Sequence, residues 1–321
     1  MPVLSYKGLD AYYEVAGDER APLVAFVNGL TMRAGHWGPY AEALAKAGLR
    51  ALTFDLFGQG MSAKPILQLD FRENEDLLIA LLDRLGVEKA YICGISYGGV
   101  IVLELPIRFP ERIKGIIPMS TFSELDAILE RVSFNFYDDM VRGSFDMLLN
   151  WLTVYNFSPR KLAAVAADFA SAKRSSAGAN DLYAIQNLME SLKNFKGFTS
   201  ELAAIECPAL IMNGEYDALT PRHFHELLRQ KIKRSRLMLI QHAYHAFSLE
   251  FPEITQRLLI DFVRQVESGR WKGDQTVWVA EDRADARRIA FPCPGDHTRC
   301  IPFPKAPGAK TPKFYSPDDS E

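Results

Sequence analysis

The apolar positions of this chain follow two periods that alternate along most of its length. Continuous apolar runs predict strands over residues 23–27, 50–56, 90–93, 112–120, 208–214 and 236–241. Between these runs apolar residues recur at helical spacing, as in the stripe Leu77, Leu78, Leu81, Leu82 and Leu85. Residues 3–6 and 11–15 add a predicted edge hairpin. The alternation predicts an α/β fold with a mostly parallel central sheet, flanking helices and right-handed crossovers.

Two segments depart from this alternation. From Thr121 to about Ala204 the pattern holds helical stripes and no strand, so we expect a helical cap (121–204) inserted into an α/β core made of 1–120 and 205–268. After Gly269 a short strand fits within 271–280, but prolines crowd the stretch beyond Ile289. Residues 269–321 are therefore expected to be a proline-rich C-terminal extension, without regular structure beyond Ile289.

The spacing of apolar residues changes most abruptly at Ser96, from that of a strand to that of a helix. The run 90–93 predicts a strand, and the apolar spacing from Gly98 predicts a buried helix, so the chain must turn sharply at Gly-Ile-Ser-Tyr-Gly. This G-x-S-x-G pattern is typical of a nucleophile elbow, in which the serine has a strained backbone and the glycines let strand and helix pass closely. Pro106 falls inside the predicted helix, which we expect to kink or end near Leu105.

Composition narrows the function classes. The net charge is −3, with 37 basic and 40 acidic residues interspersed, which argues against a nucleic-acid partner. No apolar run approaches the ~20 residues of a membrane span, and the N-terminus lacks the pattern of a signal peptide, so we expect a cytoplasmic protein without a transmembrane segment.

The four cysteines fall into two pairs. Cys93 and Cys207 adjoin predicted strands and are expected to be small buried residues. Cys293 and Cys300 flank His297 in the tail, where a disulfide or a metal site is conceivable and two surface thiols are favoured. We expect no metal and no cofactor.

A serine nucleophile requires a base and an orienting carboxylate. Of six histidines, His245 follows the strand that ends at Gln241, and Asp217 follows the strand within 208–214. Both should therefore lie at the carboxyl edge of the sheet, where the elbow also points. Alternatives remain open, since Asp217 could be a turn residue and Glu215 or His242 could hold these roles.

Five stretches in this order resemble the α/β-hydrolase fold superfamily across about 10–268. They are 27–30 (Val-Asn-Gly-Leu), 54–62 (Phe-Asp-Leu-Phe-Gly-Gln-Gly-Met-Ser), the elbow, 214–221 and 245–252. The resemblance implies Ser96 as nucleophile, His245 as general base and then acid, and Asp217 as orienting carboxylate. It also implies an oxyanion hole made by the backbone N–H groups of Leu30 and Tyr97.

The first loop departs from the superfamily pattern, because Asn28 stands where histidine is usual. This alters the side chain that braces the oxyanion hole but leaves its backbone donors in place. The loop, the cap length and the stretch 213–217 are also similar to bacterial 3-hydroxyacyl transferases that act on carrier-protein or coenzyme A thioesters. Asn28, Phe134 and Trp151 are the candidate substrate-binding residues, with the two cap aromatics lining an apolar acyl site or forming cap core.

The sequence therefore predicts a serine hydrolase that cleaves a small-molecule carboxylic ester through an acyl-enzyme. An acyltransferase that moves an acyl group from a thioester to an alcohol or thiol is the second interpretation. A non-catalytic binding protein on the same fold is the third. An exposed cap would also suit a homodimer.

Overall fold

A computed structural model describes residues 2–66, 70–165, 168–281 and 290–293. Within them one sheet has the strand order β1-β2-β4-β3-β5-β6-β7-β8-β9-β10. The strands are β1 (Val3–Tyr6), β2 (Leu9–Ala16), β3 (Leu23–Val27), β4 (Arg50–Phe54), β5 (Ala90–Ile95), β6 (Ile113–Met119), β7 (Ala209–Gly214), β8 (Ser235–Ile240), β9 (Val277–Ala280) and β10 (Ala290–Pro292). Strands β3 to β9 pair in parallel, and β1, β2 and β10 add antiparallel edges. The predicted α/β architecture is confirmed, and the six core strands differ from the predicted ranges by at most two residues at either end.

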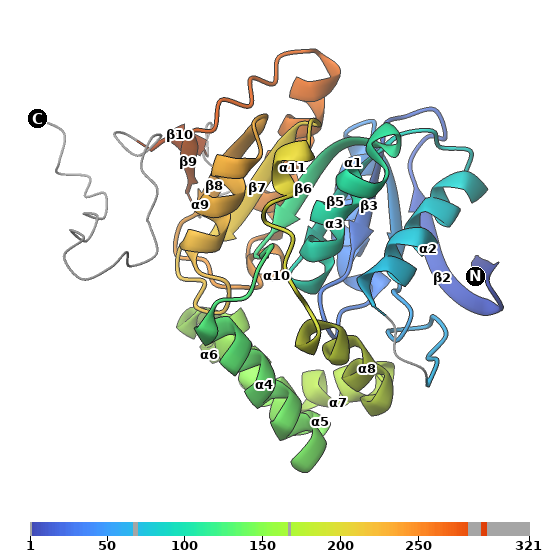
Figure 1. Cartoon of the computed structure of the whole chain (residues 1–321), viewed down its shortest axis with the longest axis vertical. Coiled ribbons are helices and arrows are strands. Elements are labelled where there is room, and N and C mark those ends of the chain that lie inside the picture. The colour runs from blue at the N-terminus through green and yellow to red at the C-terminus, as the bar shows by residue number, and fades with distance from the viewer. Residues whose placement is uncertain (1, 67–69, 166–167, 282–289, 294–321) are drawn as a thin grey trace, which may run out of the picture.

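Helices cover both faces of this sheet (Figure 1). One face packs against α1 (Gly38–Lys46) and α11 (Pro252–Glu267), and the other against α2 (Phe71–Arg84), α3 (Tyr97–Arg108) and α9 (Arg222–Lys231). Successive residues of β3 belong alternately to the two cores, because side chains of a strand point to opposite faces. This is why the strands are continuously apolar.

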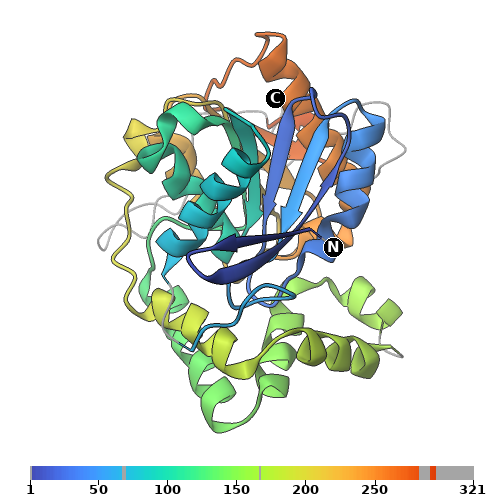
Figure 2. The same cartoon turned by 90° about the vertical axis from the view of Figure 1, so that its right-hand side faces the viewer.

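Five helices between β6 and β7 form a layer at one end of the sheet (Figures 1 and 2). They are α4 (Ala127–Arg142), α5 (Phe145–Asn156), α6 (Pro159–Val165), α7 (Phe169–Ala179) and α8 (Leu182–Lys193), and we call them the cap helices. Buried residues of α4, α5 and α8, such as Phe136, Leu148 and Ile185, share one hydrophobic cluster with the sheet. The cap helices therefore pack onto the core through a continuous apolar interface.

Short links tie the end of α5 and the start of α6 to the segment around His245. The carbonyl of Asn156 accepts the Ala246 N–H at 3.0 Å. The Ser158 hydroxyl donates to Glu250, which also accepts the Ser158 N–H at 3.1 Å. The cap and the loop that carries His245 are thus joined directly.

Four details differ from the sequence expectations. Helix α3 continues through Pro106 to Arg108, since a proline in the final turn removes only one helical hydrogen bond before the helix ends. Helix α7 was not anticipated, because its sequence, Phe-Ala-Ser-Ala-Lys-Arg-Ser-Ser-Ala-Gly-Ala, has almost no large apolar residues to form a stripe. Val141 and Ile128, placed in apolar stripes, are exposed on α4.

The extension is also more regular than expected. Residues 290–292 form β10 against β9 despite their proline, which is tolerated on an edge strand. Cys293 is buried, and its N–H donates to Val277 O at 2.9 Å, so the expectation of a surface thiol is wrong for this residue. His297 and Cys300 lie outside the described residues. No helix among the described residues has the length and apolarity to span a bilayer.

Candidate active site

Ser96 occupies the strained apex of the turn between β5 and α3. Its φ of 55° and ψ of −119° lie outside the ordinary regions for a residue with a side chain. A Cβ on Gly98 would lie 2.5 Å from Val27 O, and one on Gly94 would lie 2.8 Å from Gly98 O. The Ser96 N–H donates to Met119 O at 2.9 Å, which anchors the turn to β6. The local sequence thus forces the serine into its conformation, as a nucleophile elbow requires.

Asp217 and His245, which are 28 positions apart, are hydrogen-bonded and almost fully buried. His245 Nδ1 lies 3.0 Å from Asp217 Oδ2 and 3.1 Å from Oδ1. Because a carboxylate only accepts, Nδ1 must be the donor, so a neutral His245 leaves Nε2 free to accept a proton. The bond thereby sets the histidine tautomer that a general base needs.

The Asp217 carboxylate is held ionised by its neighbours. Burial alone would raise its pKa, but the charge and hydrogen bond of His245 and the Thr220 N–H hold the pKa of Asp217 below its ordinary value. Oδ1 accepts the N–H groups of Leu219 at 3.0 Å and Thr220 at 2.9 Å, and Oδ2 accepts the Thr220 hydroxyl at 2.8 Å. Asp217 is therefore both the ionised partner of His245 and the organiser of its own loop.

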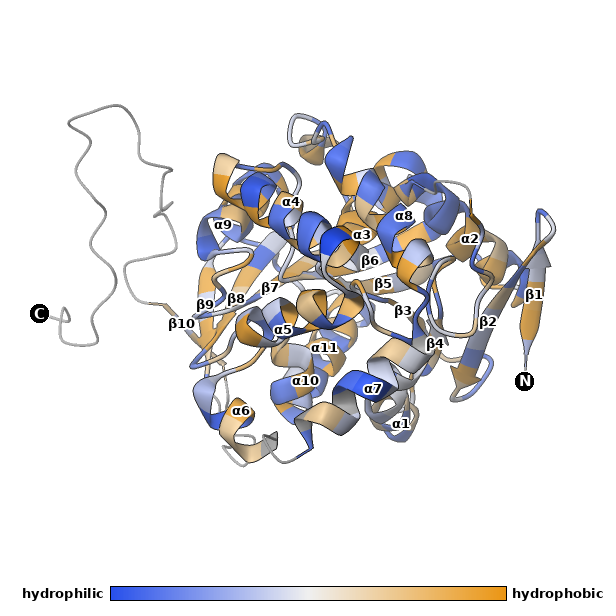
Figure 3. Ribbon diagram, turned by 90° about the horizontal axis from the view of Figure 1, so that it is seen from below, coloured by the Kyte–Doolittle hydropathy of each residue, from blue (hydrophilic) through white to orange (hydrophobic). Residues whose placement is uncertain are grey.

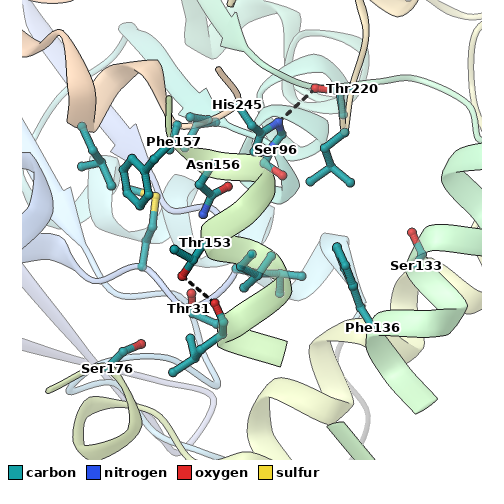
Figure 4. Close-up of a pocket in the computed structure, with 18 of the residues that line it drawn as sticks. Thr31, Ser96, Ser133, Phe136, Thr153, Asn156, Phe157, Ser176, Thr220 and His245 are labelled. Atoms are coloured by element: carbon teal, nitrogen blue, oxygen red, sulfur yellow. Dashed lines mark hydrogen bonds between the residues drawn. The ribbon is translucent and has the colours of Figure 1, made fainter. Parts of the chain in front are cut away.

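Thr220 was missed by sequence reasoning. Its hydroxyl lies between Asp217 and His245 Nδ1, 3.3 Å from the latter (Figure 4). The signal in the sequence was that Thr220 stands three residues after Asp217. In such a turn the side-chain oxygen of the aspartate commonly accepts a backbone N–H from a following residue. Thr220 thus contacts both members of the pair.

A cavity of about 340 Å³ lies between the carboxyl edge of the sheet and the cap helices, and we call it the Ser96 cavity. Ser96 and His245 both line it, and Figure 4 shows the two side chains next to each other. Within the described residues no hydrogen bond joins them, a looseness that catalytic pairs often show without substrate. The geometry brings all three residues of the sequence-predicted set to one place.

The expected oxyanion donors border the same cavity. Leu30 lines the cavity, and Tyr97 is the first residue of α3. In the loops and turns of the described chain, neither of these two backbone N–H groups acts as a donor. An unengaged N–H next to a nucleophile suits a developing oxyanion, and the assignment stays a prediction.

The three residues expected to bind substrate do not line this cavity. Asn28 is fully buried, where its Nδ2 donates to Phe54 O at 3.1 Å and its Oδ1 accepts the Trp37 indole N–H at 2.9 Å. It braces the loop that holds Leu30. Trp151 is 45% exposed and Phe134 lines a separate small cavity.

Helical phase explains the two cap aromatics. On α5 the residues Leu149, Leu152 and Thr153 line the Ser96 cavity, so the intervening Trp151 projects to the opposite side. On α4 the cavity face carries Ser133 and Phe136, which turns Phe134 away from it. Aromatic content indicated a cap core without specifying which face each ring would occupy.

The two residues considered as alternatives, Glu215 and His242, do not line the Ser96 cavity. His242 is exposed outside the cavity, and Glu215 accepts the His242 N–H at 2.8 Å. His225 is a further buried histidine close to this site, and its Nε2 accepts the Thr121 N–H at 3.0 Å. Burial lowers the pKa of His225 to about 4, so the ring is neutral and structural at pH 7.

No three His, Cys, Asp or Glu side chains gather as metal ligands in the described part of the chain. The donor set at the Ser96 cavity is a serine, a histidine and a carboxylate already bonded to that histidine. These groups can perform nucleophilic acyl chemistry by themselves.

Comparison with known proteins shows the family to which the chain belongs. Residues 22–252 match the family model for the alpha/beta hydrolase fold, so the chain belongs to that family of hydrolytic enzymes. It is 26% identical over 269 residues to the RutD protein of Azorhizobium caulinodans, covering 83% of this chain and 100% of that one. It is 27% identical over 274 residues to 3-oxoadipate enol-lactonase 1 of Acinetobacter baylyi, covering 83% and 97%.

A solved structure of similar fold is the enol-lactonase from Burkholderia xenovorans LB400. The TM-score is 0.75 at 21% identity, with 82% of this chain and 100% of that chain covered. At this identity the similarity shows the fold. The matched range, 22–252, spans the elbow, Asp217 and His245.

Proposed function

We propose that the protein hydrolyses carboxylic esters through a Ser96–His245–Asp217 triad and an acyl-enzyme intermediate. The observation that carries the proposal is the buried Asp217–His245 hydrogen bond next to a serine in strained backbone conformation, both opening on one cavity. The named activity of the Acinetobacter relative, opening a lactone, is hydrolysis of a cyclic ester and supports this class of substrate.

Each group has a defined task in this reaction. His245 Nε2 takes the Ser96 hydroxyl proton as Oγ attacks the ester carbonyl, and the Leu30 and Tyr97 N–H groups receive the developing oxyanion. The imidazolium, stabilised by Asp217, then protonates the departing alcohol. Water activated by His245 attacks the acyl-enzyme, which releases the acid and regenerates the serine.

The first experiment is covalent labelling with a fluorophosphonate together with turnover of p-nitrophenyl esters. Ser96→Ala is expected to abolish labelling and lower kcat at least a hundredfold. Ser133→Ala, which alters another serine lining the same cavity, should keep the labelling. Turnover by Ser96→Ala above a hundredth of wild type would refute the assignment, and absence of labelling in the wild type would favour a binding protein.

The same assay tests whether the acyl group is transferred to water or to another acceptor. Product that partitions to an added alcohol or thiol in water would indicate an acyltransferase, whereas exclusive hydrolysis would exclude that interpretation. The homodimer and the cytoplasmic location stay predictions from the sequence.

A further inference from the structure

The Ser96 cavity has an uneven distribution of charge. The residues that line it include His36, Lys161 and Lys173 but neither aspartate nor glutamate. Lys173 Nζ is 3.0 Å from Asp146 Oδ2, which lies outside the cavity and compensates its charge. The Lys161 ammonium forms no hydrogen bond or ion pair with any described residue. Within the described part of the chain, a cation bordering a mostly apolar space is thus left without a partner.

The charge is confined to one side of the cavity. Helix α5 lies between the α4–α8 pair and the α6–α7 pair (Figure 3). The lining on the α4–α8 side is hydrocarbon apart from Ser133 and forms what we call the apolar arm: Phe122, Leu129, Phe136, Leu149, Met189 and Leu192. The α6–α7 side and the adjoining N-terminal loop, which also contribute Met32 and Phe157, carry the charged and further polar lining residues that form what we call the basic arm: Thr31, His36, Lys161, Lys173 and Ser176.

Ser96 and His245 lie between the two arms. In Figure 4 Phe136 and Ser133 lie on one side of the serine, whereas Thr31 and Ser176 lie on the other. A substrate with its reacting carbonyl at Ser96 would extend into both arms. One half of the substrate would therefore contact mainly apolar side chains, and the other half would contact polar and charged ones.

The basic arm supplies neutral donors in addition to its cation. His36 Nδ1 accepts the Arg33 N–H at 3.0 Å, so a neutral His36 carries its proton on Nε2. Burial, together with the nearby Arg33, lowers the pKa of His36 and keeps it neutral. A lining with one ammonium uncompensated by described residues, a second paired with Asp146, and neutral donors matches a singly charged carboxylate better than a dianionic phosphate.

We propose that the substrates of this site are amphiphilic ester monoanions, with a hydrocarbon half bound in the apolar arm and a carboxylate paired with Lys161 in the basic arm. This inference rests on the proposed ester hydrolysis. It adds Lys161 as a residue that determines specificity.

The test compares each carboxylate with its neutral, nearly isosteric amide. Monooctyl succinate against octyl succinamate places the charge on the acyl half, and 3-(octanoyloxy)propanoate against its amide places it on the alcohol half. In the wild type, kcat/KM for the carboxylate should exceed that for the amide by about tenfold or more in at least one pair, the scale of a charge-assisted hydrogen bond.

Variants of Lys161 test whether this residue causes the preference for the carboxylate over the amide. Lys161→Met should lower that ratio about tenfold, and Lys161→Arg should restore most of it. The control Lys46→Met removes an exposed lysine of α1, outside the cavity, and should retain the wild-type ratio. Ratios near one in both pairs, or a ratio insensitive to Lys161→Met, would overturn the proposal.

Binding separates this inference from the proposed function. Ser96→Ala protein is titrated calorimetrically with monooctyl succinate, octyl succinamate and the alcohol-side pair. Tighter binding of a carboxylate, lost on adding Lys161→Met, supports the basic arm even if no ester is turned over. Equal affinities within each pair would refute it even if esters are hydrolysed.

Discussion

Asp217→Asn gives the sharpest test of the triad, because the structure dictates how the amide must be oriented. Asp217 Oδ1 accepts two backbone N–H groups, at 3.0 and 2.9 Å, so the amide oxygen of the variant must take that position. The amide NH₂ then replaces Oδ2, opposite His245 Nδ1. Near His245 Nδ1 only Oδ1 of this side chain remains an acceptor, 3.1 Å away and already accepting two backbone N–H groups, so the variant favours the tautomer with its proton on Nε2, which cannot accept one from Ser96.

The wrong tautomer of His245 should lower kcat strongly without unfolding the protein. In serine hydrolysis of this type such a substitution lowers kcat by about 10⁴, equivalent to about 5.4 kcal/mol. The loop keeps its backbone bonds to Oδ1, and the Thr220 hydroxyl can turn to accept from the new amide, so the melting temperature should change little.

Initial rates with p-nitrophenyl esters and circular dichroism melting measure both quantities. Glu215→Gln is the matched control, since Glu215 was the alternative carboxylate and lies on the same loop. A loss below tenfold in a folded Asp217→Asn protein, or an equal loss in Glu215→Gln, would show that another group orients His245.

Three further predictions concern stability. Gly98→Ala places a methyl group 2.5 Å from Val27 O and should lower the free energy of unfolding in urea by about 2–3 kcal/mol. Gly38→Ala is the control, because its methyl group would have no atom within 4 Å, and it should be neutral. Equal effects of the two substitutions would contradict the close approach of Gly98 to Val27. Because the buried His225 has its pKa lowered to about 4, its contribution to stability should fall by about 3 kcal/mol as the pH drops from 6.5 to 4, and His225→Gln should remove this contribution in urea titrations. Burial, then the nearby Glu75, raises the pKa of Glu104 to about 8, so the contribution of Glu104 to stability should decline from pH 4.5 to 8, and Glu104→Gln should melt higher than wild type at pH 8 but not at pH 5; a constant difference would argue against the shift.

The sequence by itself determined the order of elements and the chemistry of the elbow. Strand and helix periods depend on residues within a few positions of each other, which is why the ranges of the core strands were predictable. Gly94 and Gly98 flank Ser96 for a local steric reason that the contacts with Val27 and Gly98 carbonyls reproduce. Chain order, together with the family resemblance, indicated Asp217 and His245 and left Glu215 and His242 as alternatives, which the hydrogen bond between Asp217 and His245 does not involve.

The tertiary structure decided what surrounds those residues. A helix's rotation about its own axis is set by all its neighbours, so only the packed cap shows that Leu152 faces the cavity and Trp151 faces solvent. The basic arm likewise brings His36 from one end of the core together with Lys161 from the cap. No periodicity links positions so far apart, because they line one cavity only after the cap has packed onto the core, where the α7 segment is hydrogen-bonded to the N-terminal loop. The candidate reactive groups follow from local sequence, whereas the lining of the cavity beside them follows from how the cap is packed.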